Sequence, residues 1–189
     1  MIMNWSPLIG AAQIATGRPQ GLARFGDTPQ AFLAALAPWL AFPLVGALAL
    51  LVSGNLAEAA TTLCLTLVGQ LSPAILSHAL AARWQREAEW LRYAIAFVWC
   101  QWVIMVAFLA MLVATPIMVG IGLTPDSAAT VLGLALGAYG LWLHWTLARN
   151  GLLLSRGRAA VLVLVVNVGT AVLVMAPLLL HLGLNGSSE

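Results

Sequence analysis

The sequence contains no lysine and has little charge of either sign. Its 189 residues include eight basic and six acidic residues, so charged residues make up 7% of the chain and hydrophobic residues 62%. Soluble domains average about 25% charged residues, and so few charged side chains cannot cover the surface of a soluble protein. This composition excludes a cytosolic enzyme, a nucleic-acid-binding domain and a disordered chain. It predicts a multi-pass membrane protein with little chain outside the bilayer.

Cysteine and catalytic motifs are also scarce. Cys64 and Cys100 both lie in apolar stretches without CxxC spacing, which is typical of small apolar residues rather than of a disulfide or a metal site. The sequence has no GxSxG, HExxH or P-loop motif and no paired carboxylates. We therefore expect neither an enzyme nor a bound cofactor.

Five apolar stretches are long enough to cross a bilayer, which requires roughly 20 residues per helix. They predict an all-α bundle of five transmembrane helices at about 31–53, 56–77, 91–115 (with an apolar continuation to 123), 128–147 and 159–182. Pairs of a capping residue and proline, Thr28-Pro29 and Thr124-Pro125, mark two helix starts, and Asn150-Gly151 indicates a helix end. The chain then divides into a tail with an interfacial helix (1–30), a five-helix membrane domain (31–182) and a short second tail (183–189).

The eight arginines predict the orientation of the chain. They fall before the first span, between the second and third, and between the fourth and fifth: Arg18, Arg24, Arg83, Arg86, Arg92, Arg149, Arg156 and Arg158. With five spans these segments lie on one side, and the positive-inside rule puts that side in the cytoplasm. The N-terminus is therefore predicted to be cytoplasmic and the C-terminus periplasmic. The exclusive use of arginine, with much Ala, Leu and Gly, favours a bacterial inner membrane and a GC-rich genome.

Two groups of residues inside the spans are candidates for helix packing. Ala129, Gly133 and Gly137 form a small-residue stripe that favours close approach of another helix. We expect that helix to belong to the same chain, with a second subunit as the alternative. The second group comprises the deep amides Gln70, Gln101 and Asn167. Such amides usually hydrogen-bond between helices, and substrate binding is the alternative.

The chain has one charged run, residues 83–92, between the second and third spans. On a continuous helix, Arg83 could pair with Glu87, and Arg86 with Trp90. The simpler interpretation is a solvated helix with local pairs. The functional interpretation is a contact surface for a partner or for anionic lipid headgroups, formed by Arg83, Arg86, Trp90 and Arg92.

Two histidines offer a further, less favoured alternative. His78 and His144 lie near the cytoplasmic ends of spans that run in the same direction, and two facing imidazoles can hold a haem iron. His78, however, lies at the expected water boundary rather than inside the bundle. The favoured prediction is therefore that no cofactor binds.

The end of the chain resembles bacterial members of the Yip family of small multi-span proteins. The resemblance rests on Tyr139-Gly-Leu-Trp142, Leu147-Ala-Arg149-Asn-Gly151-Leu and Arg158-Ala-Ala, and elsewhere on span layout. The DLYGP-type motif of the eukaryotic members is missing from the N-terminal tail. The resemblance implies a membrane-shaping, scaffold or partner-binding role and transfers no site residues.

These observations favour a non-enzymatic inner-membrane scaffold or accessory subunit of a larger membrane protein complex. Its expected partners are the lipid bilayer and other membrane subunits, and not nucleic acid. The alternative is a small transporter or channel, which prolines within the spans and the deep amides favour.

Overall fold

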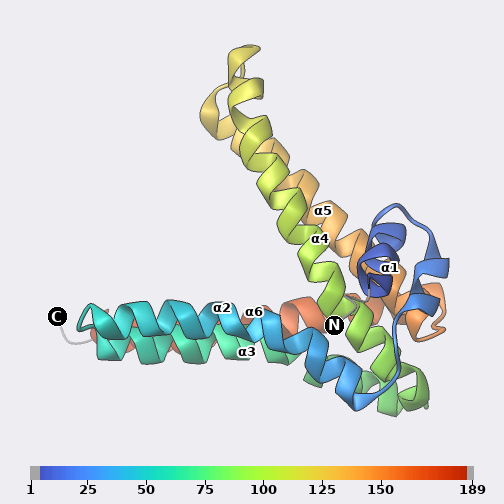
Figure 1. Cartoon of the computed structure of the whole chain (residues 1–189). Coiled ribbons are helices and arrows are strands. Elements are labelled where there is room, and N and C mark those ends of the chain that lie inside the picture. The colour runs from blue at the N-terminus through green and yellow to red at the C-terminus, as the bar shows by residue number, and fades with distance from the viewer. Residues whose placement is uncertain (1–4, 187–189) are drawn as a thin grey trace.

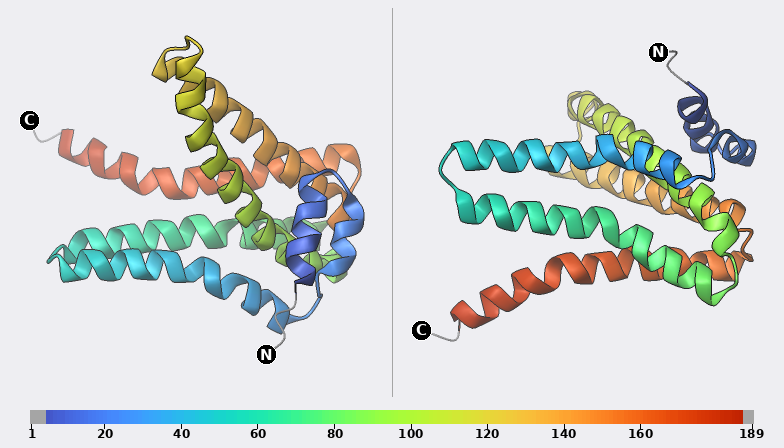
Figure 2. Two further views of the ribbon diagram at one scale, coloured as in Figure 1. Left: turned by 45° about the horizontal axis from the view of Figure 1, so that its top comes forward. Right: turned by 60° about the horizontal axis from the view of Figure 1, so that its bottom comes forward.

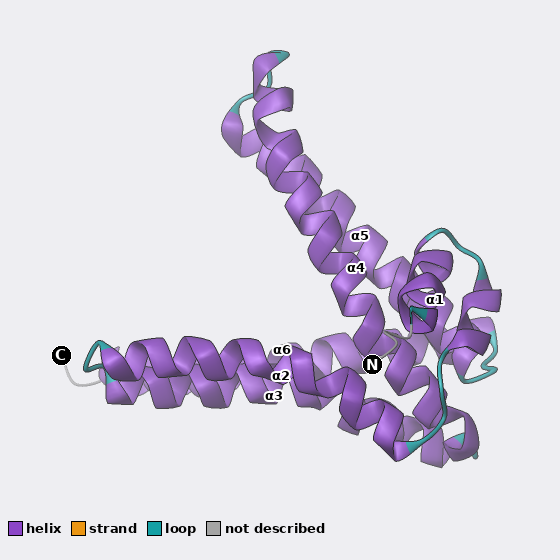
Figure 3. Cartoon of the chain, viewed as in Figure 1, coloured by secondary structure: helices purple, strands orange, loops and turns teal. Residues whose placement is uncertain are grey.

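The computed structural model describes residues 5–186, with side chains to residue 177. This part of the chain is helical and contains no strand (Figure 3). Five of its helices, α2 to α6, are long and apolar enough to span a membrane, which confirms the predicted number of spans. The elements are α1 (Ser6–Ala15), the 3-10 helix η1 (Pro19–Arg24), α2 (Pro29–Val52), α3 (Leu56–Arg83), α4 (Glu87–Gly120), α5 (Pro125–Gly151) and α6 (Arg156–Gly186).

The predicted starts of α2 and α5 are confirmed by their caps. The Thr28 hydroxyl accepts a hydrogen bond from the Ala31 amide at 3.2 Å, and the Thr124 hydroxyl accepts one from the Ser127 amide at 3.2 Å. In each case proline follows the cap, where its missing amide hydrogen costs nothing.

The predicted helix end at Asn150-Gly151 is confirmed, since α5 ends at Gly151, but the glycine is not the residue that caps it. Gly151 is still helical, and Leu153 takes the left-handed conformation with φ of 52°. Gly151 has a different use, because a Cβ there would lie 3.3 Å from the Tyr93 side chain. The glycine therefore permits close packing of α5 on α4 instead of capping the helix.

A turn between α3 and α4 replaces the continuous helix that the pairings in residues 83–92 require. α3 ends at Arg83, Gln85 has φ of 58°, and α4 begins at Glu87. The Arg86 amide donates to the Ala81 carbonyl at 2.8 Å and closes this turn. Arg86 pairs with Glu89 at 3.5 Å instead of meeting Trp90.

The five long helices form two arms that diverge from a common junction (Figures 1 and 2). α2, α3 and α6 form one arm, in which α3 contacts both of its neighbours. The α4–α5 hairpin forms the other arm. The arms touch where the first half of α4 meets α2 and α3, and where the second half of α5 meets α6. Beyond this junction the hairpin extends away from the other arm (Figure 1).

The buried core lies at the junction. The largest side chains that are almost completely buried include Tyr93, Ile95, Leu143, Leu147, Leu152 and Leu162, from α4, α5, the following turn and α6. Farther along α4, side chains such as Leu109, Val113 and Ile117 are exposed. The junction is adjacent to the arginine-rich turns, so it lies at the end of the molecule that the sequence assigns to the cytoplasm.

The N-terminal segment folds back onto the junction as a helical unit formed by α1 and η1. Gly10 and Gly21 bring these two elements into backbone contact, since a Cβ on Gly10 would lie 2.9 Å from the Gly21 carbonyl oxygen. The Tyr139 hydroxyl of α5 donates to the Ala15 carbonyl at 3.1 Å, and Arg92 of α4 pairs with Asp27 at 2.9 Å. This ion pair is half exposed and contributes about 0–1 kcal/mol. The predicted tail is thus a packed element in residues 5–27.

Replacing Gly10 with Ala tests this packing. The added methyl group must displace backbone, and overpacking of this kind costs roughly 1–3 kcal/mol, offset by up to about 1 kcal/mol of helix propensity. We expect a lower unfolding temperature in detergent and faster tryptic cleavage after Arg24. The matched control is Gly46→Ala in α2, where a Cβ meets no atom within 4 Å. Equal stability of the two variants would contradict the packing.

Candidate functional site

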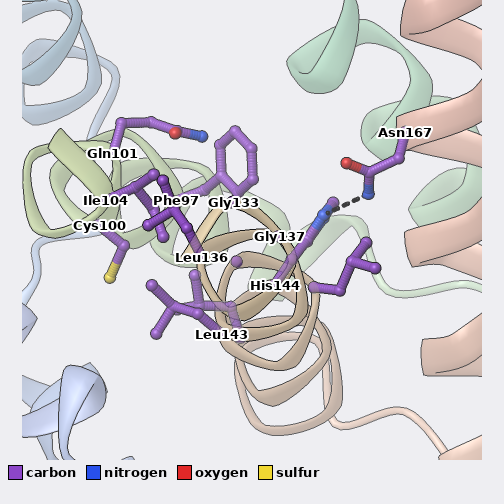
Figure 4. Close-up of a pocket in the computed structure, with 13 residues that line it drawn as sticks. Phe97, Cys100, Gln101, Ile104, Gly133, Leu136, Gly137, Leu143, His144 and Asn167 are labelled. Carbon is purple, nitrogen blue, oxygen red and sulfur yellow. Dashed lines mark hydrogen bonds between the residues drawn. The ribbon is translucent and has the colours of Figure 1, made fainter. Parts of the chain in front are cut away.

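A cavity of about 500 Å³ lies at the junction, between α4, α5 and α6. Its lining is mainly apolar, and its polar members are Gln101 of α4, His144 of α5 and Asn167 of α6. Figure 4 shows these side chains approaching the cavity from different helices, with Asn167 beside the His144 ring. The other lining residues are Phe97, Cys100, Ile104, Gly133, Leu136, Gly137, Gly140, Leu141, Leu143 and Leu147.

The His144 ring is hydrogen-bonded through both of its nitrogens. Its Nδ1 lies 3.0 Å from Asn167 Nδ2, and its Nε2 lies 2.9 Å from the Tyr93 hydroxyl. The side chains of Tyr93 and His144 are 1% and 6% exposed. These two hydrogen bonds connect α4, α5 and α6 inside the apolar junction.

The contacts of Asn167 determine the direction of these hydrogen bonds. Its Nδ2 also lies 2.7 Å from the Val163 carbonyl oxygen, which accepts only from a donor, so the amide nitrogen is correctly oriented. His144 Nδ1 must therefore accept from Asn167, and the hydrogen of the neutral imidazole is on Nε2. That hydrogen is donated to the Tyr93 oxygen. A second proton on the ring would bring two donors together at Nδ1.

A second set of hydrogen bonds joins α4 to α3 at the junction. Ser77 of α3 accepts from Trp90 Nε1 at 3.1 Å and donates to the Ala74 carbonyl at 3.1 Å. Together with the two bonds of His144, hydrogen bonds between side chains therefore link α3, α4, α5 and α6 at the junction.

Two polar groups at the cavity have no hydrogen-bond partner in the described part of the chain. The Gln101 side chain makes no hydrogen bond, and both contacts of Asn167 use its nitrogen, which leaves Oδ1 available. In hydrocarbon, an amide without a partner costs several kcal/mol. The wall of the cavity therefore presents two amide groups whose hydrogen-bonding capacity is not used by the described part of the chain.

The predicted small-residue stripe faces the space between the arms. Gly133 and Gly137 line the cavity, and a Cβ on either glycine would meet no atom within 4 Å. Ala129, one turn farther out, is exposed. The expected close contact with a helix of the same chain is therefore not formed at these glycines, and contact with a second subunit stays a prediction.

The three deep amides have different surroundings. Asn167 forms the interhelical hydrogen bond to His144. Gln101 faces the cavity, whereas Gln70 of α3 is outside it, and Gln70 Oε1 is buried without a hydrogen-bond partner. In the sequence, all three amides are surrounded by apolar residues, so the sequence alone does not predict which of them bonds to another helix, lines the cavity or lies outside it.

The predicted contact surface at residues 83–92 is only partly available. The Trp90 ring packs against Phe32 and His78 at centroid distances of 5.8 and 4.7 Å, and its nitrogen binds Ser77. Trp90 therefore packs between α2 and α3 and is partly buried, while its predicted contact with a partner or with headgroups stays a prediction. Arg83 is exposed, while Arg86 and Arg92 are in ion pairs with Glu89 and Asp27.

The haem alternative does not fit this geometry. Both nitrogens of His144 are engaged in hydrogen bonds, so no lone pair is free for iron. The rings of His78 and Trp90 pack at an interplanar angle of 82°, with their centroids 4.7 Å apart, so His78 is not paired with His144.

Tyr93 and Ser77 are part of the site but were missed by sequence reasoning. Tyr93 follows Arg92 at the predicted membrane boundary, where an aromatic residue is expected as an interfacial anchor. Its burial depends on the contact with Gly151, which is 58 residues away in the sequence. One signal in the sequence could have grouped these residues. Tyr93, His144 and Asn167 each lie within nine residues of an arginine, and so near the same predicted membrane boundary.

Comparisons with known proteins add no relative, since no protein-family profile, curated protein or solved structure matches the chain. The resemblance to the Yip family therefore stays a prediction.

Replacing Tyr93 with Phe tests the network. The change leaves the Nε2 hydrogen of His144 buried without an acceptor, which costs about 1–3 kcal/mol. We expect a lower unfolding temperature in detergent, and little further loss from this change in a His144→Phe background because the hydrogen bond is already absent. Thr61→Val is the control, since the Thr61 hydroxyl bonds only the Ala57 carbonyl of its own helix at 2.9 Å. Additive losses for Tyr93→Phe and His144→Phe would contradict the coupling.

Proposed function

We propose that this protein is a non-enzymatic scaffold or accessory subunit of a larger assembly in a bacterial inner membrane. The observation that carries the proposal is the separation of the α4–α5 hairpin from the other arm (Figure 1). The most apolar part of α4 has a mean hydropathy of 2.5 and no buried residue. Beyond the junction, the hairpin of α4 and α5 is separated from the other arm and offers its outer part to another membrane protein.

The small-residue stripe supports this proposal. Small residues let helix backbones approach closely, and this packing drives association in lipid because burial of apolar surface does not. Among the described side chains, none lies within 4 Å of the position that a Cβ would take at Gly133 or Gly137. A membrane segment of another subunit is the occupant we propose for the outer part of this space, next to Ala129.

The small transporter is the second candidate, and the observation that favours it is the cavity with Gln101 and Asn167 in its wall. Against it, the inner wall of the cavity on the arginine-rich side is formed by Leu143, His144 and Leu147, which are all buried. Purification in mild detergent separates the two functions. A stable complex with other proteins supports the subunit, and a homo-oligomer with flux in liposomes supports the transporter.

The orientation is part of the proposal, with the N-terminus in the cytoplasm and the C-terminus in the periplasm. Cysteines are introduced singly at Arg86, Arg156, Ser53 and Asp126 on a Cys64→Ala, Cys100→Ala background. An impermeant thiol reagent added to cells with a permeabilised outer membrane should label positions 53 and 126 only, because the positive-inside rule holds the arginine-rich turns in the cytoplasm. Labelling at 86 and 156 would reverse the orientation.

Enlarging the stripe tests the proposed contact with a partner. Ala129→Leu should reduce the yield of the complex about tenfold, since overpacking at a tight contact costs roughly 1–3 kcal/mol. The matched control is Ala138→Leu, an exposed alanine of α5 nine residues away and so on the opposite face of the helix. Both variants should insert normally. Equal complex yield from the two would rule out the stripe as the contact.

A further inference from the structure

We propose that the cavity at the junction binds an uncharged, lipid-soluble molecule that carries a hydroxyl or carbonyl group on an apolar body. This inference concerns a small-molecule site and does not depend on the proposed partner subunit. It rests on the cavity of about 500 Å³ and on the polar groups of Gln101 and Asn167 in its wall.

The occupant must form hydrogen bonds. The amide of Gln101 has two donor hydrogens and one acceptor oxygen, and none of them has a partner in the described chain. Acyl chains of the bilayer would fill the space but leave this amide unpaired. A hydroxyl or carbonyl oxygen accepts from the Gln101 nitrogen, and a hydroxyl also donates to an amide oxygen such as Asn167 Oδ1.

The occupant must also be uncharged and mostly apolar. Within the described part of the chain, no arginine, aspartate or glutamate lines the cavity, so a charged group would be without a counter-ion in a membrane interior. His144 supplies no charge, because its hydrogen bonds require the neutral ring. Phe97, Ile104, Leu136 and Leu141 provide apolar walls for the rest of the molecule.

The shape of the site favours a small molecule over a partner helix. A helix with its side chains is about 10–12 Å in diameter and runs through the whole bilayer. The inner end of the cavity is formed by Leu143, His144 and Leu147, all buried where α4, α5 and α6 meet. A spanning helix placed between the arms would therefore collide with the junction, whereas a volume of about 500 Å³ suits an ordinary ligand.

Photolabelling of the full chain in phosphatidylcholine vesicles tests the proposal. The probe is hexadecanol carrying a diazirine on its chain, compared with the same diazirine on hexadecane, both below saturation. We expect the alcohol to label peptides containing Ile104, Leu136 or Leu141 about 3- to 20-fold more than the alkane does, the range of one membrane hydrogen bond. Unlabelled hexadecanol should compete for this labelling.

Gln101→Leu should reduce the labelling by the alcohol to the level of the alkane. Gln70→Leu is the matched control, because it removes the same amide from a deep position outside the cavity. Equal labelling by the two probes in the wild-type protein would overturn the proposal and indicate that water satisfies Gln101. Absence of labelling at the cavity, or the same reduction in both variants, would also overturn it. If Gln101→Leu fails to fold, competition by unlabelled hexadecanol in the wild-type protein still tests the site.

Discussion

The hydrogen bond between His144 and Asn167 connects the two arms, the one between His144 and Tyr93 joins the two helices of the hairpin, and the rest of the architecture depends on this pair of bonds. Asn167 belongs to the α2–α3–α6 arm, whereas His144 and Tyr93 belong to the α4–α5 hairpin. In lipid, helices gain little by burying apolar surface against each other, so packing and hydrogen bonds decide which helices associate. A connected polar network at one end is therefore sufficient to define a junction while the helices beyond it separate. The α1–η1 unit adds contacts on the outside of the same junction.

This constraint also explains why the cavity and the open stripe lie next to each other. The network draws α4, α5 and α6 together at His144, and from that point the arms diverge. The wedge between them begins at the junction as a partly open cavity, whose wall contains the amide groups and the glycines, and continues into the space between the arms. In water such a wedge would collapse to hide its apolar walls, but in a bilayer lipid, a ligand or another subunit fills it. The position of Gln101 near the closed end gives that part of the wedge its chemical selectivity.

The sequence predicts the helices far better than their arrangement. Length and hydropathy define five spans, and Thr28 and Thr124 mark two of their starts, because these signals are local. The arrangement of the arms depends on contacts between distant residues, such as Gly151 against Tyr93, which composition does not reveal. The amides show the same limit. Gln70, Gln101 and Asn167 have similar apolar neighbours in sequence, yet one is buried without a partner, one faces a cavity and one joins two helices.

The most direct test of this architecture is the distance between the outer ends of the two arms in a bilayer. Spin labels at Ser53, after α2, and at Leu123, after α4, report this distance by pulsed electron resonance in lipid nanodiscs. A junction confined to one end predicts a distance far beyond the 8–10 Å that separates the axes of packed helices. Tyr93→Phe should broaden the distribution because it weakens the network. A single short distance, as expected for a closed five-helix bundle, would contradict the divergence of the arms.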